Sequence, residues 1–373
     1  MNCSKCGKEN PDDARFCNSC GAALVSTPTQ APGVVVKTSG MAIAAMVLGI
    51  LSLFTFGLTA LPALIFGIIS LVIIEKSGGR ITGRGFAIAG ILSPVLGLLP
   101  LMAILLPALV RVNQMAFRTV CATNLSGLGK AMVIYSNDYD GEYPRAGGMN
   151  SRWSFTIQNW RADNRYAAYG LGTDGSGGNA TISSSLYLLV KYAEVTPKSF
   201  ICKGDSGTKE FKLTEYAGGD IELIDLWDFG PNSSEHCSYA YHMPYGLYAL
   251  TTSSEPGMAI AADRNPWMTS PAAEGKDAAL LSSYNPTGGK EMVNVGNAIA
   301  HQEDGQNVLF MDNHVGFMKQ PFCGINDDNI YTYWDGGDIR RGGYPMAGVC
   351  EPMDRLDSFL VHDGEGGAPP VLP

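Results

Sequence analysis

Two long runs without charge constrain this chain more than any other feature. Residues 41–74 form 34 consecutive positions, and residues 86–110 a further 25, with no Asp, Glu, Lys or Arg. A helix needs about 20 largely apolar residues to cross a hydrocarbon core about 30 Å thick. Soluble cores use shorter uncharged segments, so the pattern favours membrane-spanning helices over buried core helices. We therefore expect a membrane protein with the lipid bilayer as a partner.

The first run is too long for one crossing. As a single helix it would measure about 51 Å, well above the thickness of the hydrocarbon core. Gly57 and Pro62 mark a break near its middle, which leaves two helices of about 17 residues each. We expect a helical hairpin over 41–74 and a further span over 86–110. One long tilted helix in place of the hairpin is the alternative, which would leave two spans instead of three.

A short basic loop, residues 75–85, separates the two runs. It contains the cations Lys76, Arg80 and Arg84 and one anion, Glu75. Short loops rich in Lys and Arg stay on the cytoplasmic side of a membrane. The loop therefore predicts a cytoplasmic N-terminus and an extracytoplasmic domain from about residue 111 onward.

Two Cys-x-x-Cys pairs lie at the N-terminus: Cys3, Cys6, Cys17 and Cys20. This spacing can place four thiolates around one zinc ion, and the glycine after each pair permits a tight turn. A segment of 24 residues with almost no apolar core needs metal to fold. Disulfides would need an oxidising compartment, and a redox pair would need a βαβ pattern that does not precede residue 40. The four cysteines therefore predict a structural zinc site.

The charge is divided unevenly along the 373 residues, whose net charge is −9. Residues 1–111 carry a net charge of +4, and the remaining 262 carry −13. Phosphate contacts need clustered Lys and Arg, so the acidic larger part argues against nucleic acid as a partner. The length itself predicts two or three structural units.

Two stretches resemble small known modules. Residues 1–24, with Cys-x-x-Cys-Gly followed by Phe-Cys-x-x-Cys-Gly, resemble the zinc ribbon at the N-termini of many bacterial membrane proteins. Residues 40–99, with Gly-Gly-Arg-x-x-Gly-Arg-Gly at their centre, resemble a small bacterial membrane domain of unknown function. The small and polar residues 25–40 are typical of a linker. Both resemblances imply a bacterial inner (cytoplasmic) membrane.

An amphipathic helix follows the last uncharged run. Its apolar face is marked by residues at alternating steps of four and three: Cys121, Leu125, Leu128, Met132 and Tyr135. The helix is expected to continue the membrane span and to stop near Asp138–Gly141, where glycine supplies the turn. The sequence thus predicts one long helix that enters a domain beyond the membrane.

The residues around this helix resemble a known family. The motifs are Leu105-Leu-Pro107, Arg118-Thr-Val-Cys121-x-x-Asn124, Tyr135-x-Asn-Asp138-Tyr-Asp-Gly141-x-Tyr-Pro144, Ala262-Asp263-Arg-Asn-Pro266, His301 to His314, and Gly324-x-x-x-Asp328-Asn-Ile-Tyr331-Thr332. They resemble bacterial pseudopilin-like proteins, similar to the major pseudopilin of type II secretion, with a prepilin-type processing-associated H-x9-D-G domain. The resemblance covers roughly residues 101–145 and 199–334. It implies an α+β head over 111–361, with a long N-terminal helix and an antiparallel sheet, followed by a loose tail over 362–373.

Two departures from the family pattern matter. Pilins are cut before a membrane helix whose fifth residue is Glu, but the comparable place here, Gly85–Phe86, is followed by Gly90, and residues 86–110 contain no glutamate. Processing and entry into a filament are therefore left open. Ten residues rather than nine separate His301 from Asp312, and an asparagine replaces the glycine after it. Asparagine tolerates a left-handed backbone best after glycine, so this second change is mild.

The resemblance implies a multi-domain, non-enzymatic membrane protein of the bacterial envelope. It would be a structural or accessory protein of a secretion-type assembly, with protein partners in the envelope or with copies of itself as a homo-oligomer. The alternative is a transmembrane ligand-binding or sensory module whose zinc ribbon docks a cytoplasmic partner. A third hypothesis is a metal-dependent hydrolase that uses His301 and His314.

The strand pattern around His301, Asp312 and His314 predicts how far apart these side chains lie. Residues 308–317 are typical of one strand, preceded by a two-residue turn at Asp304–Gly305. That hairpin would place His301 opposite Val308 and about 13 Å from Asp312. The distance is too long for one metal, so structural roles are expected for His301, Asp312 and His314. Calcium near Asp312 or near 327–329 is the alternative occupant.

The remaining cysteines leave their pairing open. Five lie beyond the membrane runs: Cys121, Cys202, Cys237, Cys323 and Cys350. An odd number leaves at least one unpaired, and the sequence does not show which. The five tryptophans are expected in the core, and residues 170–183 are expected to form a glycine-rich loop.

Overall fold

The computed structural model describes residues 1–24, 36–55, 57–216, 221–271, 273–346 and 350–364. The chain divides into two compact units, Met1–Leu109 and Val110–Pro373, and each is described by itself. Most of the predicted linker, residues 25–35, and most of the predicted tail, residues 365–373, lie outside the described residues.

The predicted helical hairpin is present in the first unit. Helix α1 covers Gly40–Phe54 and α2 covers Ala60–Lys76, so the break falls where the glycine and proline predicted it. Ser39 caps α1 by accepting a hydrogen bond from the backbone N–H of Ala42 at 3.3 Å. The side-chain cap satisfies one of the free N–H groups at the start of the helix.

A small parallel sheet joins the two ends of this hairpin. Strand β1 (Lys37–Thr38) pairs with β2 (Ile81–Thr82), in register Lys37 to Ile81. The predicted linker therefore ends in a strand and a helix cap, and the predicted basic loop contains the partner strand. Because the strands are paired, the entry to the hairpin and the basic loop lie on the same side of it.

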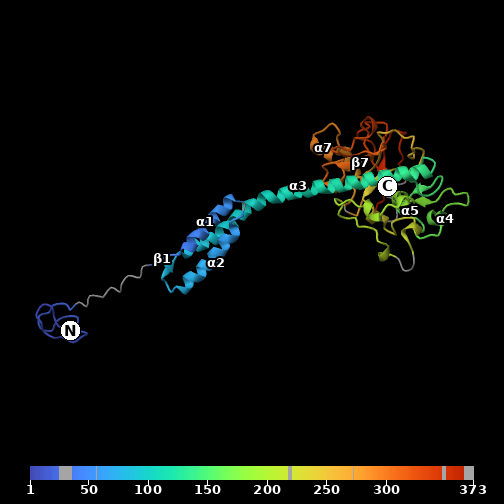
Figure 1. The fold of residues 1–373 in the computed structure, drawn as a ribbon. Helices are drawn as coiled ribbons and strands as arrows, with labels where there is room; N and C mark the ends of the chain where they lie inside the picture. Colours follow the sequence, from blue (N-terminus) through green and yellow to red (C-terminus); the bar gives the residue numbers. More distant parts are fainter. Residues whose placement is uncertain (25–35, 56, 217–220, 272, 347–349, 365–373) are drawn as a thin grey trace. The chain divides into compact units, whose positions relative to one another are not determined.

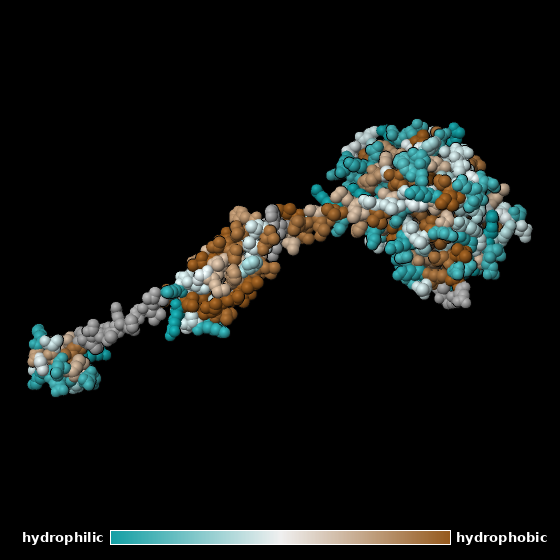
Figure 2. All heavy atoms as spheres, viewed as in Figure 1, coloured by the Kyte–Doolittle hydropathy of each residue, from teal (hydrophilic) through white to brown (hydrophobic). Residues whose placement is uncertain are grey.

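The three helices of the first unit, α1, α2 and α3 (Arg84–Asp138), bury small residues and expose large apolar ones. The buried positions include Ala42, Ala45, Gly49, Ser52, Ala63, Gly67, Ser70 and Ala87. The exposed positions include Ile43, Val47, Ile50, Phe54, Leu61, Ile65, Ile68, Val72, Phe86, Leu92 and Leu96. Figure 2 shows the apolar surface that covers these helices. Helices in lipid pack through small residues in this way, whereas helices in water bury their large ones.

Gly90 lies at a close approach between α1 and α3. A Cβ atom built at Gly90 would lie 2.5 Å from the carbonyl carbon of Ala45, so only glycine fits there. This explains the first departure from the pilin pattern in physical terms. A glutamate at this position would collide with the backbone of α1.

Replacing Gly90 with Leu is expected to separate α1 from α3. The Leu side chain would have to enter the space of the Ala45 backbone, and overpacking of this kind destabilises by about 2 kcal/mol or more. The measurement is the thermal denaturation of the detergent-solubilised chain, followed by size-exclusion chromatography. Gly85→Leu is the matched control, because a Cβ at Gly85 meets no atom within 4 Å. Equal melting temperatures for the two variants would contradict the prediction.

The predicted third span and amphipathic extension form one continuous helix, α3, of 55 residues. Among the described residues, α3 is the one helix long and apolar enough to cross a membrane, and α1 is a shorter apolar helix. The helix ends at Asp138 as expected, and Gly141 adopts a left-handed φ of 81° just beyond it. Residues 110–138 of α3 belong to the second unit.

The second unit, called the head below, is built around a five-stranded antiparallel sheet of order β8-β7-β6-β5-β9. Its strands are β5 (Tyr239–His242), β6 (Ala259–Asp263), β7 (Gln306–Phe310), β8 (Val315–Met318) and β9 (Leu360–Val361). The expected antiparallel sheet is therefore present. A separate parallel pair joins β3 (Arg152–Trp153) to β4 (Asn179–Ala180).

Short helices complete the head. The α-helices are α4 (Arg165–Tyr169), α5 (Ile182–Tyr192), α6 (Ala278–Ser283) and α7 (Lys290–Asn294). The 3-10 turns are η1 (Pro197–Phe200), η2 (Leu213–Glu215), η3 (Leu223–Asp225), η4 (Ser233–His236), η5 (Ile299–His301) and η6 (Ile325–Asp327). Figure 1 shows α3 running through this part of the chain, with β7 and α5 beside it.

The amphipathic face of α3 lies in the main core of the head. All five predicted positions on that face, from Cys121 to Tyr135, are at most 6% exposed. At Gly129 a Cβ would lie 2.8 Å from the side chain of Leu309 on β7, so the helix approaches the sheet closely there. The other face of the sheet packs against a second apolar cluster that contains Trp267 and Tyr331.

Three expectations about the head need correction. Residues 308–317 are not one strand, because a turn at 311–314 separates β7 from β8. The expected loop 170–183 is shorter, since Asn179 begins β4 and Ile182 begins α5. The tail does not start at 362, because His362 and Asp363 are both 3% exposed.

Asp363 explains why the chain stays ordered beyond β9. Its carboxylate accepts hydrogen bonds from the N–H groups of Ile182 and Ser183 at the start of α5, at 2.9 and 2.7 Å. The indole N–H of Trp153 donates to the same carboxylate at 3.0 Å. A carboxylate at a helix N-terminus satisfies free N–H groups and interacts favourably with the helix dipole.

The five tryptophans belong to the core as predicted. Trp153, Trp227 and Trp267 are buried, and Trp160 and Trp334 are half-buried.

Candidate metal and thiol sites

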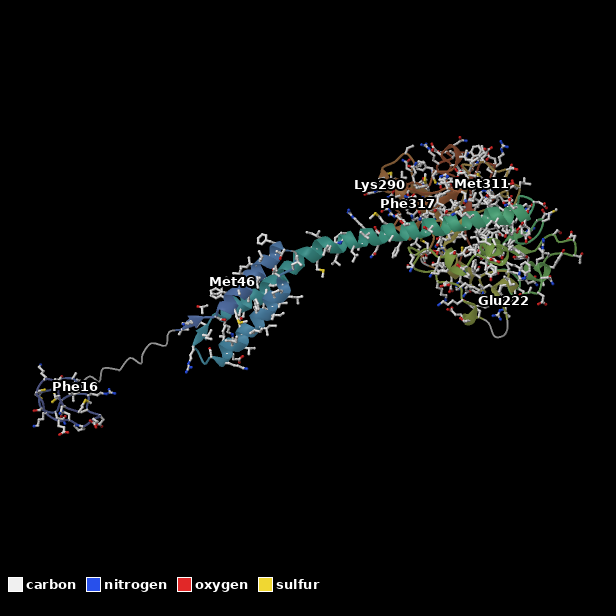
Figure 3. The ribbon with its side chains drawn as sticks, in the orientation of Figure 1. Phe16, Met46, Glu222, Lys290, Met311 and Phe317 are labelled. Atoms are coloured by element: carbon white, nitrogen blue, oxygen red, sulfur yellow. A yellow bond between two sulfur atoms is a disulfide. The ribbon has the colours of Figure 1, made fainter. Side chains whose placement is uncertain are left out.

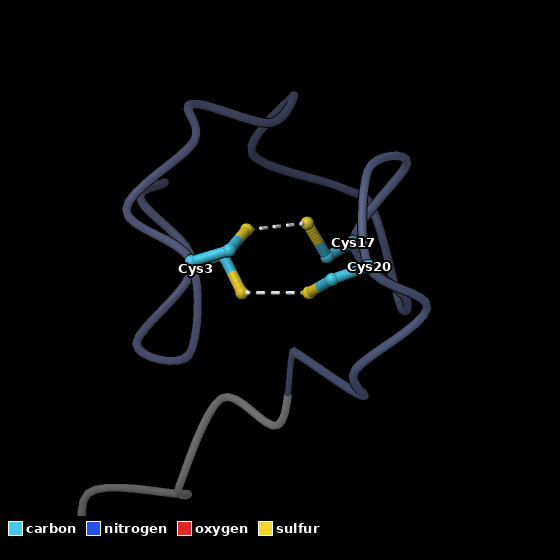
Figure 4. A group of neighbouring side chains, drawn as sticks. Cys3, Cys17 and Cys20 are labelled. Carbon is cyan, nitrogen blue, oxygen red and sulfur yellow. Dashed lines mark hydrogen bonds between the residues drawn. The ribbon is translucent and has the colours of Figure 1, made fainter.

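The four N-terminal cysteines converge on one point. The sulfurs of Cys3, Cys6, Cys17 and Cys20 all lie within 4.8 Å of one another. Sγ of Cys3 is 3.6 Å from that of Cys20, and Sγ of Cys6 is 3.6 Å from that of Cys17. Figure 4 shows Cys3 facing Cys17 and Cys20. These separations match four thiolates around a single ion of zinc.

Each Cys-x-x-Cys pair sits on the same local turn. The N–H of Gly7 donates to the carbonyl of Cys3 at 2.8 Å, and the N–H of Gly21 donates to that of Cys17 at 2.9 Å. Both glycines have left-handed φ angles, 72° and 69°, which explains why glycine follows each pair. Two short antiparallel bridges, Asn2 with Glu9 and Phe16 with Ala23, close the two turns.

Polar groups around the Cys17 sulfur favour its thiolate form. Backbone N–H groups of Ser19 and Cys20 point at Sγ of Cys17 and lower the pKa of its thiol to about 6. The buried Asn10 adds a donor, because its Nδ2 lies 3.5 Å from the same sulfur. Its Oδ1 accepts from the N–H of Asn18, which fixes the amide. Sequence reasoning missed Asn10, although a polar residue midway between the pairs was a signal for it.

These residues fit zinc. Thiolate ligands with backbone donors behind them form a structural site, and such a site supplies the folding energy that a small core lacks. With four protein ligands no position is left for substrate, so zinc here would hold the fold of residues 1–24.

The sequence leaves the pairing of five cysteines open, and the structure joins two of them. Cys121 on α3 forms a disulfide with Cys202, which follows η1, across 81 residues. Cys237, Cys323 and Cys350 are free. The disulfide therefore links the long helix to the rest of the head.

His301 does not lie where the strand pattern placed it. It ends η5 instead of facing Val308, and its ring is 2% exposed. Its Nε2 lies 3.1 Å from Oδ2 of Asp263 and 3.6 Å from Sγ of Cys202. The resemblance motifs contained both Asp263 and His301, but no spacing in the sequence indicated that they meet.

Asp312 and His314 serve the turn between β7 and β8. Oδ1 of Asp312 accepts from the backbone N–H of His314 at 3.1 Å and contacts its imidazole Nδ1. The hydrogen bond from the N–H of His314 lowers the pKa of the Asp312 carboxyl. Asn313 between them has a φ of 70°, the left-handed conformation expected where the family has glycine. A structural role for this pair agrees with its geometry.

The calcium hypothesis receives no support. Among the described residues, the groups of three or more close metal ligands include neither Asp312 nor any member of 327–329. Asp328 is buried, and its Oδ2 accepts from the backbone N–H of Ser358 at 2.7 Å. The side chain of Asn329 donates to the carbonyl of Arg340 at 3.1 Å, so these residues hold loops together.

Asp328 makes the stability of the head depend on pH. Burial, reinforced by the charge of Asp357, raises the pKa of Asp328 to about 8. Its unfolded value is about 3.9, so the folded state binds the proton more tightly. The stabilisation is complete below about pH 4 and is lost as the pH rises through about 8.

Asp328→Asn is expected to flatten this pH dependence between pH 5 and 9. The amide resembles the protonated acid, and each unit of pKa shift corresponds to about 1.4 kcal/mol, so the difference in unfolding free energy amounts to a few kcal/mol. Urea unfolding followed by tryptophan fluorescence measures it. The exposed neighbour Asp327 provides the control variant Asp327→Asn, whose slope should match the unchanged protein. A slope in Asp328→Asn as steep as in the unchanged protein would contradict the assignment, because the buried Asp228 and Asp357, whose pKa values are raised to about 7 and about 6, account only for the remainder.

Comparison with known proteins identifies two segments. The zinc-ribbon domain family matches residues 2–24, and a domain of unknown function, DUF4190, matches residues 41–106. The chain begins with a zinc ribbon. No curated protein and no solved structure matches the chain. Neither family match reaches the head, so its pseudopilin resemblance stays a prediction.

Proposed function

We propose that this chain is a non-enzymatic, membrane-anchored protein of the bacterial envelope that holds a pseudopilin-like head outside the inner membrane. It would act as a subunit or anchored accessory of a secretion-type assembly, with the zinc ribbon on the cytoplasmic side. The observation that carries the proposal is the continuity of α3. One helix has an apolar, exposed first part and a second part whose apolar face is buried in an α+β head.

The packing of the first unit supports the proposal that its helices lie in lipid. Small residues such as Ala45 and Gly90 lie at the helix contacts, while large apolar residues such as Val47 and Ile65 are 53% and 52% exposed. A large exposed apolar surface is unfavourable in water and favourable in a bilayer. Helices α1 and α2 have 15 and 17 residues and measure about 22 and 25 Å, so α2 reaches the lower limit of about 17 residues for crossing and α1 falls two residues short of it.

The pairing of β1 with β2 supports the proposed topology. It keeps Lys37 beside Ile81, so a chain that enters the hairpin also leaves it on the same side. The loop on that side is basic, which favours the cytoplasm. An odd number of crossings then leaves the head outside.

Topology reporters test this arrangement. Fusions of a cytoplasm-active fluorescent protein and a periplasm-active phosphatase are made after Gly79, in the basic loop, and after Gly141, beyond α3. We expect fluorescence alone at Gly79 and phosphatase activity alone at Gly141. The same reporter active at both positions would overturn the proposal.

The contacts of Gly90 favour an anchored accessory over a processed filament subunit. Cleavage before Phe86 would detach α1 and α2, although α1 packs directly against α3 at Gly90. We therefore expect the membrane-bound chain to keep its full mass, including the ribbon, in cells that contain a prepilin peptidase. Intact-mass spectrometry of the purified protein measures this. A product that starts at Phe86 would favour a filament subunit.

The ribbon gives one reason to keep the sensory or docking alternative. Phe16, labelled in Figure 3, is 63% exposed although it is the largest apolar side chain of the ribbon. An exposed aromatic on a metal-folded module favours contact with a protein partner. Phe16→Ser tests this. If cells with this variant behave like cells that lack the chain although the ribbon keeps its zinc, docking is supported. If they behave like cells with the unchanged chain, the result argues against docking.

A further inference from the structure

A second cluster of four donor groups lies buried in the head. Cys121, Cys202, Asp263 and His301 each offer one ligand atom, and these atoms all lie within 4.8 Å of one another. They are at most 5% exposed and come from α3, the segment after η1, the end of β6, and η5. Within the described ranges, the only other group of this kind is the ribbon.

The disulfide alone does not account for the carboxylate beside it. Oδ2 of Asp263 accepts hydrogen bonds from Asn307, from its backbone N–H at 2.7 Å and from its Nδ2 at 3.2 Å. Oδ1 of Asp263 is buried without a hydrogen-bond partner. Burying a carboxylate oxygen unpaired is costly, so this atom points to a ligand other than the protein's own donors.

The imidazole of His301 is held with Nε2 facing the cluster. That nitrogen lies 3.1 Å from Asp263, 3.2 Å from Nδ2 of Asn307 and 3.6 Å from Sγ of Cys202. Phe317, labelled in Figure 3, packs against the ring with centroids 5.9 Å apart. Gly204 leaves room on another side, because a Cβ there would come within 3.1 Å of the ring.

We propose that this cluster is a thiol-gated zinc site, in which a disulfide and a bound Zn²⁺ are alternative states. An external dithiol reduces the Cys121–Cys202 bond: two electrons and two protons pass to the sulfurs, and the dithiol becomes a cyclic disulfide. Zn²⁺ then displaces the two thiol protons. It binds both sulfurs, Nε2 of His301 and a carboxylate oxygen of Asp263.

The donor set and the charge fit zinc. Two thiolates, one imidazole and one carboxylate make four ligands of the kinds zinc accepts in tetrahedral sites. The zinc state adds −2 from the two thiolates and +2 from the ion, and the other two ligands are the same in both states. The exchange therefore buries no additional net charge. This matters because an uncompensated charge is costly in a buried site.

A cavity lies beside the segments that carry the cluster. A cavity of about 120 Å³ is lined by residues next to its members, including Gly204, Arg264 and Ala300. Arg264 is fixed there by an ion pair with Asp205 at 2.9 Å. The cavity is thus lined by the residues next in sequence to Asp263 and His301.

Zinc counting on the full chain in detergent tests the proposal. The oxidised protein is expected to hold one zinc per chain, in the ribbon. After anaerobic reduction with dithiothreitol, incubation with Zn²⁺ and desalting, it should hold two, measured by plasma mass spectrometry alongside a free-thiol assay. In Cys17→Ser/Cys20→Ser the counts should be zero and one. With Co²⁺ in place of zinc, this variant should show a thiolate-to-cobalt charge-transfer band.

Two further variants decide between a metal site and a buried ion pair. His301→Ala and Asp263→Asn are checked for folding in the oxidised state, where the disulfide is intact, by near-ultraviolet circular dichroism. When reduced, both should stay at one zinc per chain. A reduced protein that gains no zinc, or variants that gain the second zinc as readily as the unchanged chain, would overturn the proposal.

Discussion

Cys17→Ser is expected to unfold the whole ribbon and to lower the zinc content of the oxidised chain from one ion to none. The reason is that residues 1–24 have no apolar core, with Phe16 exposed, so metal ligation is the source of their folding energy. Limited trypsin digestion reads this out, because cleavage after Lys5, Lys8 and Arg15 should become rapid. Zinc measured in parallel links the unfolding to the metal.

Ser19→Ala is the matched control for this variant. Ser19 lies in the same turn as Cys17 but offers no ligand to the site. It should keep both the zinc and the resistance to trypsin. Tryptophan fluorescence should be unchanged in both variants, because all five tryptophans lie in the head. A ribbon that resists trypsin without zinc would contradict the assignment.

Removing the disulfide should destabilise the head by about 4.5 kcal/mol, the largest effect expected on its stability. Cys121 and Cys202 are 81 residues apart, and closing a loop of that length restricts the unfolded chain by roughly this free energy. The variant is Cys121→Ala/Cys202→Ala, which also removes two ligands of the proposed zinc site. Urea unfolding, followed by tryptophan fluorescence, gives the difference.

Cys237→Ala separates the cross-link from the loss of a buried sulfur. Cys237 is a free cysteine that is 5% exposed in the same core. Its replacement leaves a small cavity without changing the connectivity of the chain, so we expect a loss of about 1 kcal/mol. A double variant that loses no more than Cys237→Ala would show that the cross-link does not stabilise the head.

The turn between β7 and β8 shows how a sequence pattern misled the prediction. Residues 308–317 are mostly apolar and resemble one strand, and Asp304–Gly305 resembles a hairpin centre. The structure places the hairpin at 311–314, where Asn313 adopts a φ of 70° and Asp312 accepts from the N–H of His314. The Asp-Asn dipeptide was the turn signal that the apolar flanks concealed.

The periodic parts of the chain were predicted well. The face of α3 from Cys121 to Tyr135 is buried as its spacing indicated, and the break between α1 and α2 falls between residues 55 and 59. These features depend on neighbours within a few turns of one helix. Local spacing is enough to encode them, because helical periodicity fixes which residues share a face.

The ribbon and the helices of the apolar runs could therefore be predicted from the amino-acid sequence alone. Short spacings along the chain determine both the zinc ligands and the helices. Tertiary structure alone decided that Cys121 pairs with Cys202, and that Asp263 and His301 join them. Cys202 and His301 are 99 residues apart, and they meet because α3, β6 and β7 pack into one core. No local period encodes a contact of that kind. It follows from the order of the strands and from the close approach of α3 to β7 at Gly129.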